Sequence, residues 1–243
     1  MIFGIRAVIE AIEAGKEIDK ILVKKDMTSD LSRELFETIR GTNITVQRVP
    51  VDRINRYTKK NHQGVIAFLP AISYASLGNI VPTLFEEGKT PLILILDGIT
   101  DVRNFGAIAR TCECAGVHSI VIPKSGSVTV SGDAVKTSAG ALMTLPVCLE
   151  NSLKEALRYL KNSGFRIIAA TEKASANYTD VSYTDPVAII MGAEDTGVAP
   201  EHLKMCDDLV SIPQFGKIGS LNVSVAAGVL IYEAVRQKRL ENL

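Results

Sequence analysis

The sequence predicts an α/β protein with two parts: a small α/β domain over residues 1–70 and a larger domain with a mostly parallel sheet over residues 91–243. In the larger part, strand-sized apolar runs alternate with helical patterns, which is typical of a parallel sheet covered by helices on both faces. Residues 71–90 lie between Pro70 and Pro91 and show no long helical or strand period. We expect them to form a linker with one short helix.

The smaller part mixes helical and strand patterns within a short length of chain. In order, these patterns predict a short strand at the start, a helix over 5–14, a strand over 20–24, a helix over 29–38, and strands over 45–49 and 64–68. Ser29 is a plausible N-cap for the second helix.

The larger part has no internal repeat, and its strands and helices are predicted in alternation. The predicted strands cover residues 92–96, 119–123, 145–149, 166–170, 187–191 and 208–213. The predicted helices cover residues 107–115, 133–141, 153–161, 200–205 and 222–240.

Composition excludes several classes of protein. The chain has 243 residues, 47% apolar and 5% aromatic, so it is neither disordered nor collagen-like. Its four cysteines form no CxxC pair and it has only three histidines, which fits neither a disulfide framework nor a zinc site. The apolar runs are far shorter than the roughly 20 residues of a membrane helix, and the start lacks the pattern of an export signal. We therefore expect a cytoplasmic protein without a membrane span or a bound metal.

Charge is balanced overall but unevenly distributed. The whole chain carries 27 Lys and Arg against 27 Asp and Glu, whereas residues 1–70 carry 12 against 9. Six of these cations lie between positions 40 and 60, with Asp52 as the one acid: Arg40, Arg48, Arg53, Arg56, Lys59 and Lys60. This strip either contacts the phosphates of a nucleic acid or is a solvated face.

Three loops that follow predicted strands are candidates for the functional site, because parallel sheets bind ligands at the carboxyl ends of their strands. They cover residues 97–111, 192–201 and 212–228. The first lacks the GxGxxG and GxxxxGK[ST] spacings, so neither nucleotide-binding fingerprint applies. Each loop alone is a weak signal, but together they predict a cleft.

Four polar residues of these loops have both a structural and a functional interpretation. Asn104 lies where a helix cap is expected, and Ser220 and Asn222 compete as caps of the last helix. Arg110 lies on a helix face of small and apolar residues, where it either extends into water or binds an anion.

The glycines of the second and third loops also allow two interpretations. Gly192 and Gly197 suit a tight turn, but a turn alone does not explain Glu194 between them. Gly216 and Gly219 leave backbone N–H groups free for a ligand.

In this order and spacing, the three loops resemble the three motifs of the SpoU/TrmH family of RNA ribose 2'-O-methyltransferases, within the SPOUT superfamily. The motifs read N-x-G-A-I-x-R-T at 104–111, I-M-G-A-E-x-x-G at 190–197, and I-P-Q followed by G-S-L-N-V-S-V-A-A within 212–227. The resemblance covers about residues 91–243.

Three further segments are similar to one subgroup of this family. They are FGIRAVIEAI at 3–12, NHQGVIAFL at 61–69 and AGVHSIVIPK at 115–124. The subgroup methylates a guanosine in the peptidyl-transferase region of large-subunit (23S) rRNA. Its N-terminal substrate-binding domain resembles the fold of ribosomal protein L30e, which we expect for residues 1–70.

The resemblance implies that the larger domain contains a deep trefoil knot and binds S-adenosylmethionine there. The implied cofactor contacts are Gly192, Gly197, Ile212, Leu221, Ala170 and Thr171. The implied catalytic residues are Arg110, Asn104, Glu194, Ser220 and Asn222.

The implied reaction is an in-line displacement, in which a ribose 2'-oxygen attacks the sulfonium methyl group. The family accounts make the arginine, here Arg110, the base. Because a guanidinium is almost never deprotonated in a protein, Arg110 could instead hold a phosphate or stabilise negative charge on the ribose oxygen. Glu194 is expected to orient Arg110, while Ser220 and Asn222 position neighbouring groups.

Other potentially reactive side chains are expected to be structural. His62 and His118 lie outside the three motifs, where packing or surface roles are expected. Cys112 and Cys114 are two apart on a helix and point to different faces, so they do not pair as ligands.

The resemblance predicts an enzyme that methylates a guanosine of large-subunit rRNA and acts as a homodimer. Two alternatives remain: a tRNA 2'-O-methyltransferase of the same family, and a non-catalytic RNA-binding or ribosome-assembly protein. The N-terminal domain disfavours the first, since many tRNA-acting relatives replace it with short terminal helices. The five intact catalytic positions disfavour the second.

Overall fold

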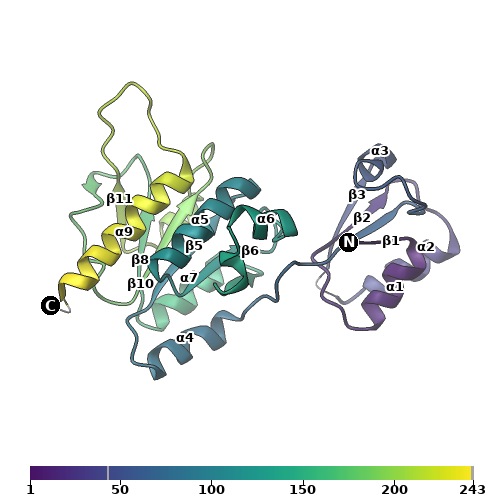
Figure 1. Ribbon diagram of the computed structural model, residues 1–243, viewed down its shortest axis with the longest axis horizontal. Helices are drawn as coiled ribbons and strands as arrows, with labels where there is room; N and C mark the ends of the chain where they lie inside the picture. The colour runs from purple at the N-terminus through teal and green to yellow at the C-terminus, as the bar shows by residue number, and fades with distance from the viewer. Residues whose placement is uncertain (43, 242–243) are drawn as a thin grey trace. The chain divides into compact units, whose positions relative to one another are not determined.

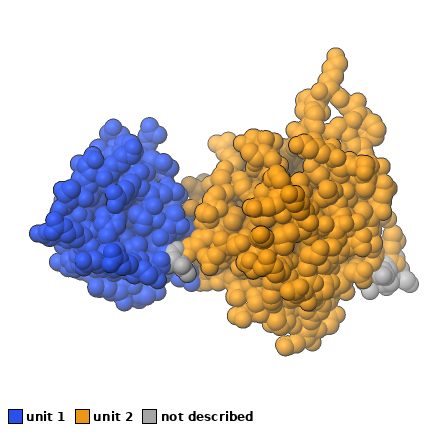
Figure 2. All heavy atoms as spheres, turned by 180° about the vertical axis from the view of Figure 1, so that it is seen from behind, with its two compact units in different colours: residues 1–71 blue, residues 72–243 orange. Residues whose placement is uncertain are grey.

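The computed structural model describes residues 1–42 and 44–241 (Figure 1). Two compact units divide the chain, one over residues 1–71 and the other from Ile72 onward (Figure 2). No described helix is long and apolar enough to cross a membrane.

Unit 1 is a small mixed sheet with helices. Its elements are β1 (Ile2–Phe3), α1 (Ile5–Glu13), β2 (Lys20–Lys24), α2 (Asp30–Ile39), β3 (Thr45–Val49), α3 (Val51–Asn55) and β4 (Val65–Phe68). The strand order is β1-β4-β2-β3, with β2 parallel to β3 and β4 antiparallel to both of its neighbours. The Ser29 side chain accepts a hydrogen bond from Ser32 N at 3.3 Å, so the predicted cap of α2 is confirmed.

The two faces of this sheet are covered differently. On one face, α1 and α2 bury residues such as Val8 and Leu35 against Ile21 and Val23 of β2. The other face carries a smaller cluster that includes Ile54 of α3. The sequence pattern did not predict α3, because a helix of five residues is too short to show a helical period.

Unit 2 is built on a seven-stranded sheet in which all paired strands are parallel. Its strands are β5 (Leu92–Asp97), β6 (Ser119–Pro123), β7 (Val147–Glu150), β8 (Arg166–Ala170), β9 (Ala176–Asn177), β10 (Val187–Gly192) and β11 (Asp208–Ser211). Their order is β7-β6-β5-β10-β8-β11-β9, so β5 and β10 are central neighbours. The expected mostly parallel sheet is confirmed. The edge strand β9 was not predicted, because two residues are too few to show a strand pattern.

Helices cover both faces of this sheet (Figure 1). They are α4 (Leu77–Glu86), α5 (Val102–Ala115), α6 (Gly132–Thr137), the 3-10 helix η1 (Ala141–Met143), α7 (Leu153–Asn162), α8 (Pro200–Leu203) and α9 (Val223–Glu241). In β5, Leu92, Leu94 and Leu96 belong to the core under α5, α6 and α9, whereas Ile93 and Ile95 face α4 and α7.

The segment over residues 72–90, predicted as part of a linker with one short helix, contains that helix and belongs to unit 2. Its helix α4 buries Leu77, Val81 and Leu84, the first two in the same core as Ile93 of β5. This burial makes most of residues 71–90 a part of unit 2.

Candidate active site

Three of the predicted catalytic side chains meet at one carboxylate oxygen. Glu194 Oε1 accepts hydrogen bonds from Asn222 Nδ2 at 2.6 Å, from Val223 N at 3.1 Å and from Asn104 Nδ2 at 3.4 Å. Asn222 Nδ2 also donates to Asn104 Oδ1 at 3.0 Å. The three motifs, which lie far apart in sequence, are therefore joined by side-chain hydrogen bonds at the carboxyl ends of β5, β10 and β11.

Asn104 reaches this cluster because another residue caps its helix. Asp101 is the N-cap of α5, and its Oδ1 accepts from Arg103 N at 2.7 Å and from Asn104 N at 2.9 Å. The cap assigned to Asn104 on sequence grounds was therefore wrong, and α5 begins at Val102 instead of residue 107. Capping by Asp101 leaves the Asn104 amide free to bond across the cleft.

Asn222 combines both of its expected roles. Its Oδ1 accepts a hydrogen bond from Ser224 N at 3.0 Å, and this bond caps α9. Its Nδ2 donates to Glu194 in the cluster. Ser220 makes no such cap and instead lines the pocket beside the cluster.

Gly192 ends β10 at a place where no side chain fits. An added Cβ would lie 2.0 Å from the carbonyl carbon of Gly197 and 2.1 Å from Val198 N. Gly197 itself has φ +67°, a left-handed conformation that favours glycine, and its N–H donates to Ala193 O at 2.8 Å. The turn therefore closes back on β10 and holds Glu194 at the cleft.

The side chain of Asp97 also holds this turn in place, from the end of β5. Asp97, paired with Gly192 across the β5–β10 ladder, accepts through Oδ2 from Ala199 N at 2.9 Å and lies 2.7 Å from His202 Nδ1. Both side chains are mostly buried, with exposures of 15% for Asp97 and 10% for His202. Sequence reasoning missed this pair, although Asp97 stands directly after an apolar strand.

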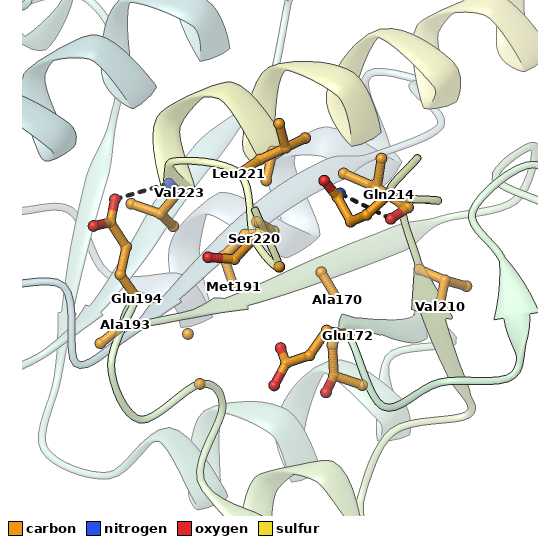
Figure 3. A pocket seen from close by; sticks show the side chains of 16 residues that line it. Ala170, Glu172, Met191, Ala193, Glu194, Val210, Gln214, Ser220, Leu221 and Val223 are labelled. Carbon is orange, nitrogen blue, oxygen red and sulfur yellow. Dashed lines mark hydrogen bonds between the residues drawn. The ribbon is translucent and has the colours of Figure 1, made fainter. Parts of the chain in front are cut away.

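A pocket lies beside the cluster (Figure 3), and we call it the main pocket. It is lined by residues 170–172, 191–194, Gly197, Val210, Ile212, Gln214, residues 219–221, Val223 and Ala226. All six residues expected to contact a cofactor are in this set: Ala170, Thr171, Gly192, Gly197, Ile212 and Leu221.

The sequence analysis missed other members of this lining. Glu172 is the second residue after β8, and its carboxylate lies across the pocket from Leu221 (Figure 3). The position of Glu172 after the predicted strand 166–170 was a signal that could have found it.

The lining fits the chemistry of S-adenosylmethionine. Met191, Val210 and Leu221 supply apolar surface for a flat ring, and the glycines expose backbone donors and acceptors. Glu172 and Gln214 supply polar groups for hydroxyl and ammonium groups.

Arg110 lies apart from the other candidates. Its side chain is exposed on α5, lines neither the main pocket nor the pocket around residues 98–101, and forms no hydrogen bond or ion pair with any described residue. The expected orientation of Arg110 by Glu194 is not found in the single chain, because the bonds of Glu194 go to Asn104, Asn222 and Val223.

His62, His118 and Cys112 have structural roles, as expected. His118 Nδ1 accepts from Leu92 N at 3.0 Å, and burial lowers the pKa of this imidazole. His62 bonds Asn55 and Gly64 N within unit 1. Burial raises the pKa of the Cys112 thiol, so it is not a reactive thiolate. Among the described residues, no group of His, Cys, Asp and Glu side chains could hold a metal ion.

A parallel α/β sheet whose glycine-bearing loops form a pocket at the strand ends is typical of one class of ligand-binding α/β proteins. Two family models identify which class this is. Residues 91–232 match the SpoU rRNA methylase family, and residues 1–75 match the substrate-binding domain of RNA 2'-O ribose methyltransferases. The chain belongs to the SpoU/TrmH family of RNA 2'-O-methyltransferases.

Individual relatives span the whole chain. The chain is 34% identical to the 23S rRNA (guanosine-2'-O-)-methyltransferase RlmB of Photobacterium profundum, over 99% of this chain and 98% of the relative. It is 32% identical to the putative TrmH family tRNA/rRNA methyltransferase YacO of Bacillus subtilis, over 98% and 95%.

Solved structures agree with this assignment. The SpoU methyltransferase AviRb from Streptomyces viridochromogenes, in complex with AdoMet, superposes with a TM-score of 0.63 at 25% identity. The match covers 99% of this chain and 90% of AviRb.

Proposed function

We propose that this chain transfers the methyl group of S-adenosylmethionine to the ribose 2'-hydroxyl of a guanosine in large-subunit rRNA. The observation that carries the proposal is the cluster of Asn104, Glu194 and Asn222 beside a pocket that fits the cofactor. Similarity over the full length to an enzyme named for 23S rRNA guanosine supports the substrate.

The main pocket would hold the cofactor. Backbone groups at Gly192 and Gly197 and the side chains of Ile212 and Leu221 would contact it. When bound, S-adenosylmethionine supplies an electrophilic methyl group on a sulfonium centre. Glu172 and Glu194 place negative charge beside this cationic group, which favours its binding.

The cluster would orient the acceptor ribose. Glu194 fixes Asn104 and Asn222 through its Oε1, so both amides are held before substrate arrives. Ser220, which lines the pocket without a hydrogen bond to a described residue, has a hydroxyl free to bond the ribose. Arg110 would stabilise negative charge on the ribose 2'-oxygen as its proton passes to solvent. The new O–CH3 bond forms as the S–CH3 bond breaks, and S-adenosylhomocysteine leaves.

The site would be completed in a homodimer. Helix α9 buries one stripe against its own sheet, including Ala227, Leu230 and Ile231. Its outer face carries a second apolar stripe, in which Val225 and Tyr232 are each 52% exposed. Such a stripe on a two-sided apolar helix is typical of a subunit interface.

The residue after Arg110 lies beside α9. An added Cβ at Gly228 of α9 would contact Thr111, the neighbour of Arg110, at 3.8 Å. A second copy seated on α9 would therefore lie beside Arg110 and give its guanidinium a partner.

The chain would also carry the trefoil knot of its family. After β11, residues 212–222 form a long loop that returns to α9, which packs beside α5 (Figure 1). At the end of this loop, Asn222 Nδ2 bonds Glu194 of the turn after β10. This return path supports a threaded connection near residues 193–199. A crystal structure tests it, since its trace from Val187 to Val223 either threads a loop or does not.

The tRNA alternative has one specific observation in its favour, because YacO is named for tRNA or rRNA. A tritiated-methyl transfer assay separates the two substrates. We expect transfer to large-subunit rRNA from cells lacking the gene, and background counts with total tRNA. Transfer to tRNA alone would overturn the rRNA assignment, and transfer to neither would favour a non-catalytic RNA-binding protein.

Cofactor binding can be tested separately from RNA. Calorimetry with S-adenosylmethionine in EDTA should show binding, because no metal-holding group is found among the described residues. The absence of both heat and thermal shift at millimolar ligand would contradict the proposal.

A further inference from the structure

A second pocket adjoins the main pocket on the other side of Glu194. We call it the adjoining pocket; it is lined by residues 98–101, Asn104, residues 193–196 and Val223. Ala193, Glu194 and Val223 line both pockets, so these three residues form the wall between them. A nucleotide in the adjoining pocket would lie next to the bound cofactor.

The adjoining pocket offers hydrogen-bond acceptors and no cation. Its lining includes the carboxylates of Asp101, Glu194 and Asp195, and no Lys, Arg or His. A phosphate would be repelled here, because anions need positive charge or N–H donors. The ligand face that fits is therefore one rich in donors.

Asp195 is the carboxylate in this lining with both oxygens available to such a ligand. Asp101 Oδ1 is engaged in capping α5, and Glu194 Oε1 accepts three internal hydrogen bonds. Asp195 is exposed in the turn after β10 and forms no hydrogen bond or ion pair with a described residue. Both of its oxygens are free to accept.

We infer that the adjoining pocket takes the guanine base of the target nucleotide and that Asp195 selects it, accepting from guanine N1–H and the N2 amino group. This rests on the proposed function. Guanine presents two neighbouring donors on its Watson–Crick edge, which match the two oxygens of a carboxylate. The hydroxyls of Thr100 and Thr196, in the same lining, can donate to guanine O6.

Other bases fit this arrangement less well. Adenine places an unprotonated N1 where guanine has N1–H, so a carboxylate there would face a lone pair. Uracil and cytosine each present only one donor group on this edge. Single-stranded RNA bases are commonly read on this edge, once they are unstacked.

The test compares guanosine with inosine, which lacks only the N2 amino group. The substrate is a synthetic rRNA fragment with either nucleoside at the mapped target position. For the wild-type chain we expect inosine to lower kcat/KM about 10- to 100-fold, as for loss of a hydrogen bond to a charged group. In Asp195→Asn this ratio should fall toward one, because the amide cannot accept from both donors.

A matched control makes the same Asp-to-Asn change at a position far from the adjoining pocket. Asp185→Asn alters an exposed carboxylate at the opposite end of β10 and should retain the wild-type ratio. An equal guanosine-to-inosine ratio in wild type and Asp195→Asn would overturn the inference while leaving the enzyme intact. Ribose methylation of a nucleotide whose base is not guanine would overturn it as well.

A binding measurement separates this inference from the proposed function. In titrations followed by NMR, the wild-type chain should prefer GMP to IMP, and Asp195→Asn should not. If no methyl transfer occurs but this preference is seen, the proposed function fails and the base site stands. If GMP and IMP bind alike, the base site fails.

Discussion

Arg110 differs from Asn104 and Asn222, because its side chain forms no hydrogen bond or ion pair with a described residue. Asn104 and Asn222 are already held by Glu194, which suits groups that must be positioned before substrate arrives. A free guanidinium suits a group that pairs with charge on the RNA or on the reacting oxygen.

Replacing Arg110 should therefore lower the rate of methyl transfer without weakening the binding of S-adenosylmethionine. We expect Arg110→Ala to lower methyl transfer about 100- to 1,000-fold, the usual cost of one transition-state donor. Binding of S-adenosylmethionine should be unchanged, since Arg110 does not line the main pocket. Arg110→Lys should recover little, because an ammonium lacks the planar fork. A near-normal rate in Arg110→Ala would remove this residue from the mechanism.

At position 192 only glycine fits, because the backbone of the following turn packs against it. We expect Gly192→Ala to abolish measurable cofactor binding and to destabilise the fold by at least about 1–3 kcal/mol, because its Cβ would overlap the Gly197–Val198 backbone. Gly216→Ala is the control, since an added Cβ there meets nothing within 4 Å. Calorimetry and thermal melts check both; normal binding by Gly192→Ala would contradict the geometry.

At this scale the sequence predicted that three polar side chains share one cleft, but it did not predict their hydrogen bonds and it missed Glu172. Motif spacing placed Asn104, Glu194 and Asn222 in one cleft. The hydrogen bonds of Asn104 depend on Asp101, three residues earlier, being the cap of α5. Asp and Asn are both good cap residues, so the local sequence does not decide between them. A partner for Arg110 could not be predicted, because none lies within the described chain.

At the scale of elements, the turn after β10 is held to β5 and α8 by one side chain. Asp97 Oδ2 bonds both Ala199 N and His202 Nδ1, largely out of water. We expect Asp97→Asn to cost about 1.5–3 kcal/mol, the usual value of hydrogen bonds to a charged group. Because the turn carries Gly197 and Glu194, the affinity for S-adenosylmethionine should fall as well.

Melting and cofactor titration measure these two effects in the same variant. Asp180→Asn is a control: it removes an exposed carboxylate that accepts a local hydrogen bond from Asn177 N, outside the main pocket. A lower melting temperature with unchanged affinity would mean that Asp97 supports the fold without shaping the pocket.

The core strands and the longer helices were predicted well, whereas two short elements were missed. The core strands of unit 2 are continuous apolar runs, because helices cover both faces of its sheet. By contrast, α3 and β9 span five and two residues, too few to show a period. Tertiary packing, not local pattern, decided that α4 joins the core of unit 2.

At the scale of the whole molecule, the proposed dimer depends on the outer face of α9. We expect Val225→Glu with Tyr232→Glu to give a monomer in light scattering, because two buried charges would face the partner. Met143→Glu, at a residue 66% exposed outside α9, should stay dimeric. A wild-type monomer at micromolar concentration would contradict the proposal.

Unit 1 should supply much of the RNA affinity. Its cations Arg53, Arg56 and Lys59 are exposed, and Arg48 lies over the Phe36 ring, 5.2 Å from its centroid. Neutralising these four should weaken RNA binding and flatten its dependence on log salt by up to about 3, since fewer counterions are released. Neutralising Lys154 and Arg158 of α7 is the control. Unchanged affinity and slope would make the strip a solvated face.

The central claim is that this chain methylates a ribose of large-subunit rRNA, and mapping that modification in cells tests it most directly. Primer extension on rRNA from cells with and without the gene should reveal one 2'-O-methylguanosine that is lost with the gene. The wild-type gene should restore it, and the Arg110→Ala gene should not. An unchanged rRNA map, or a lost methyl group in tRNA instead, would contradict the account.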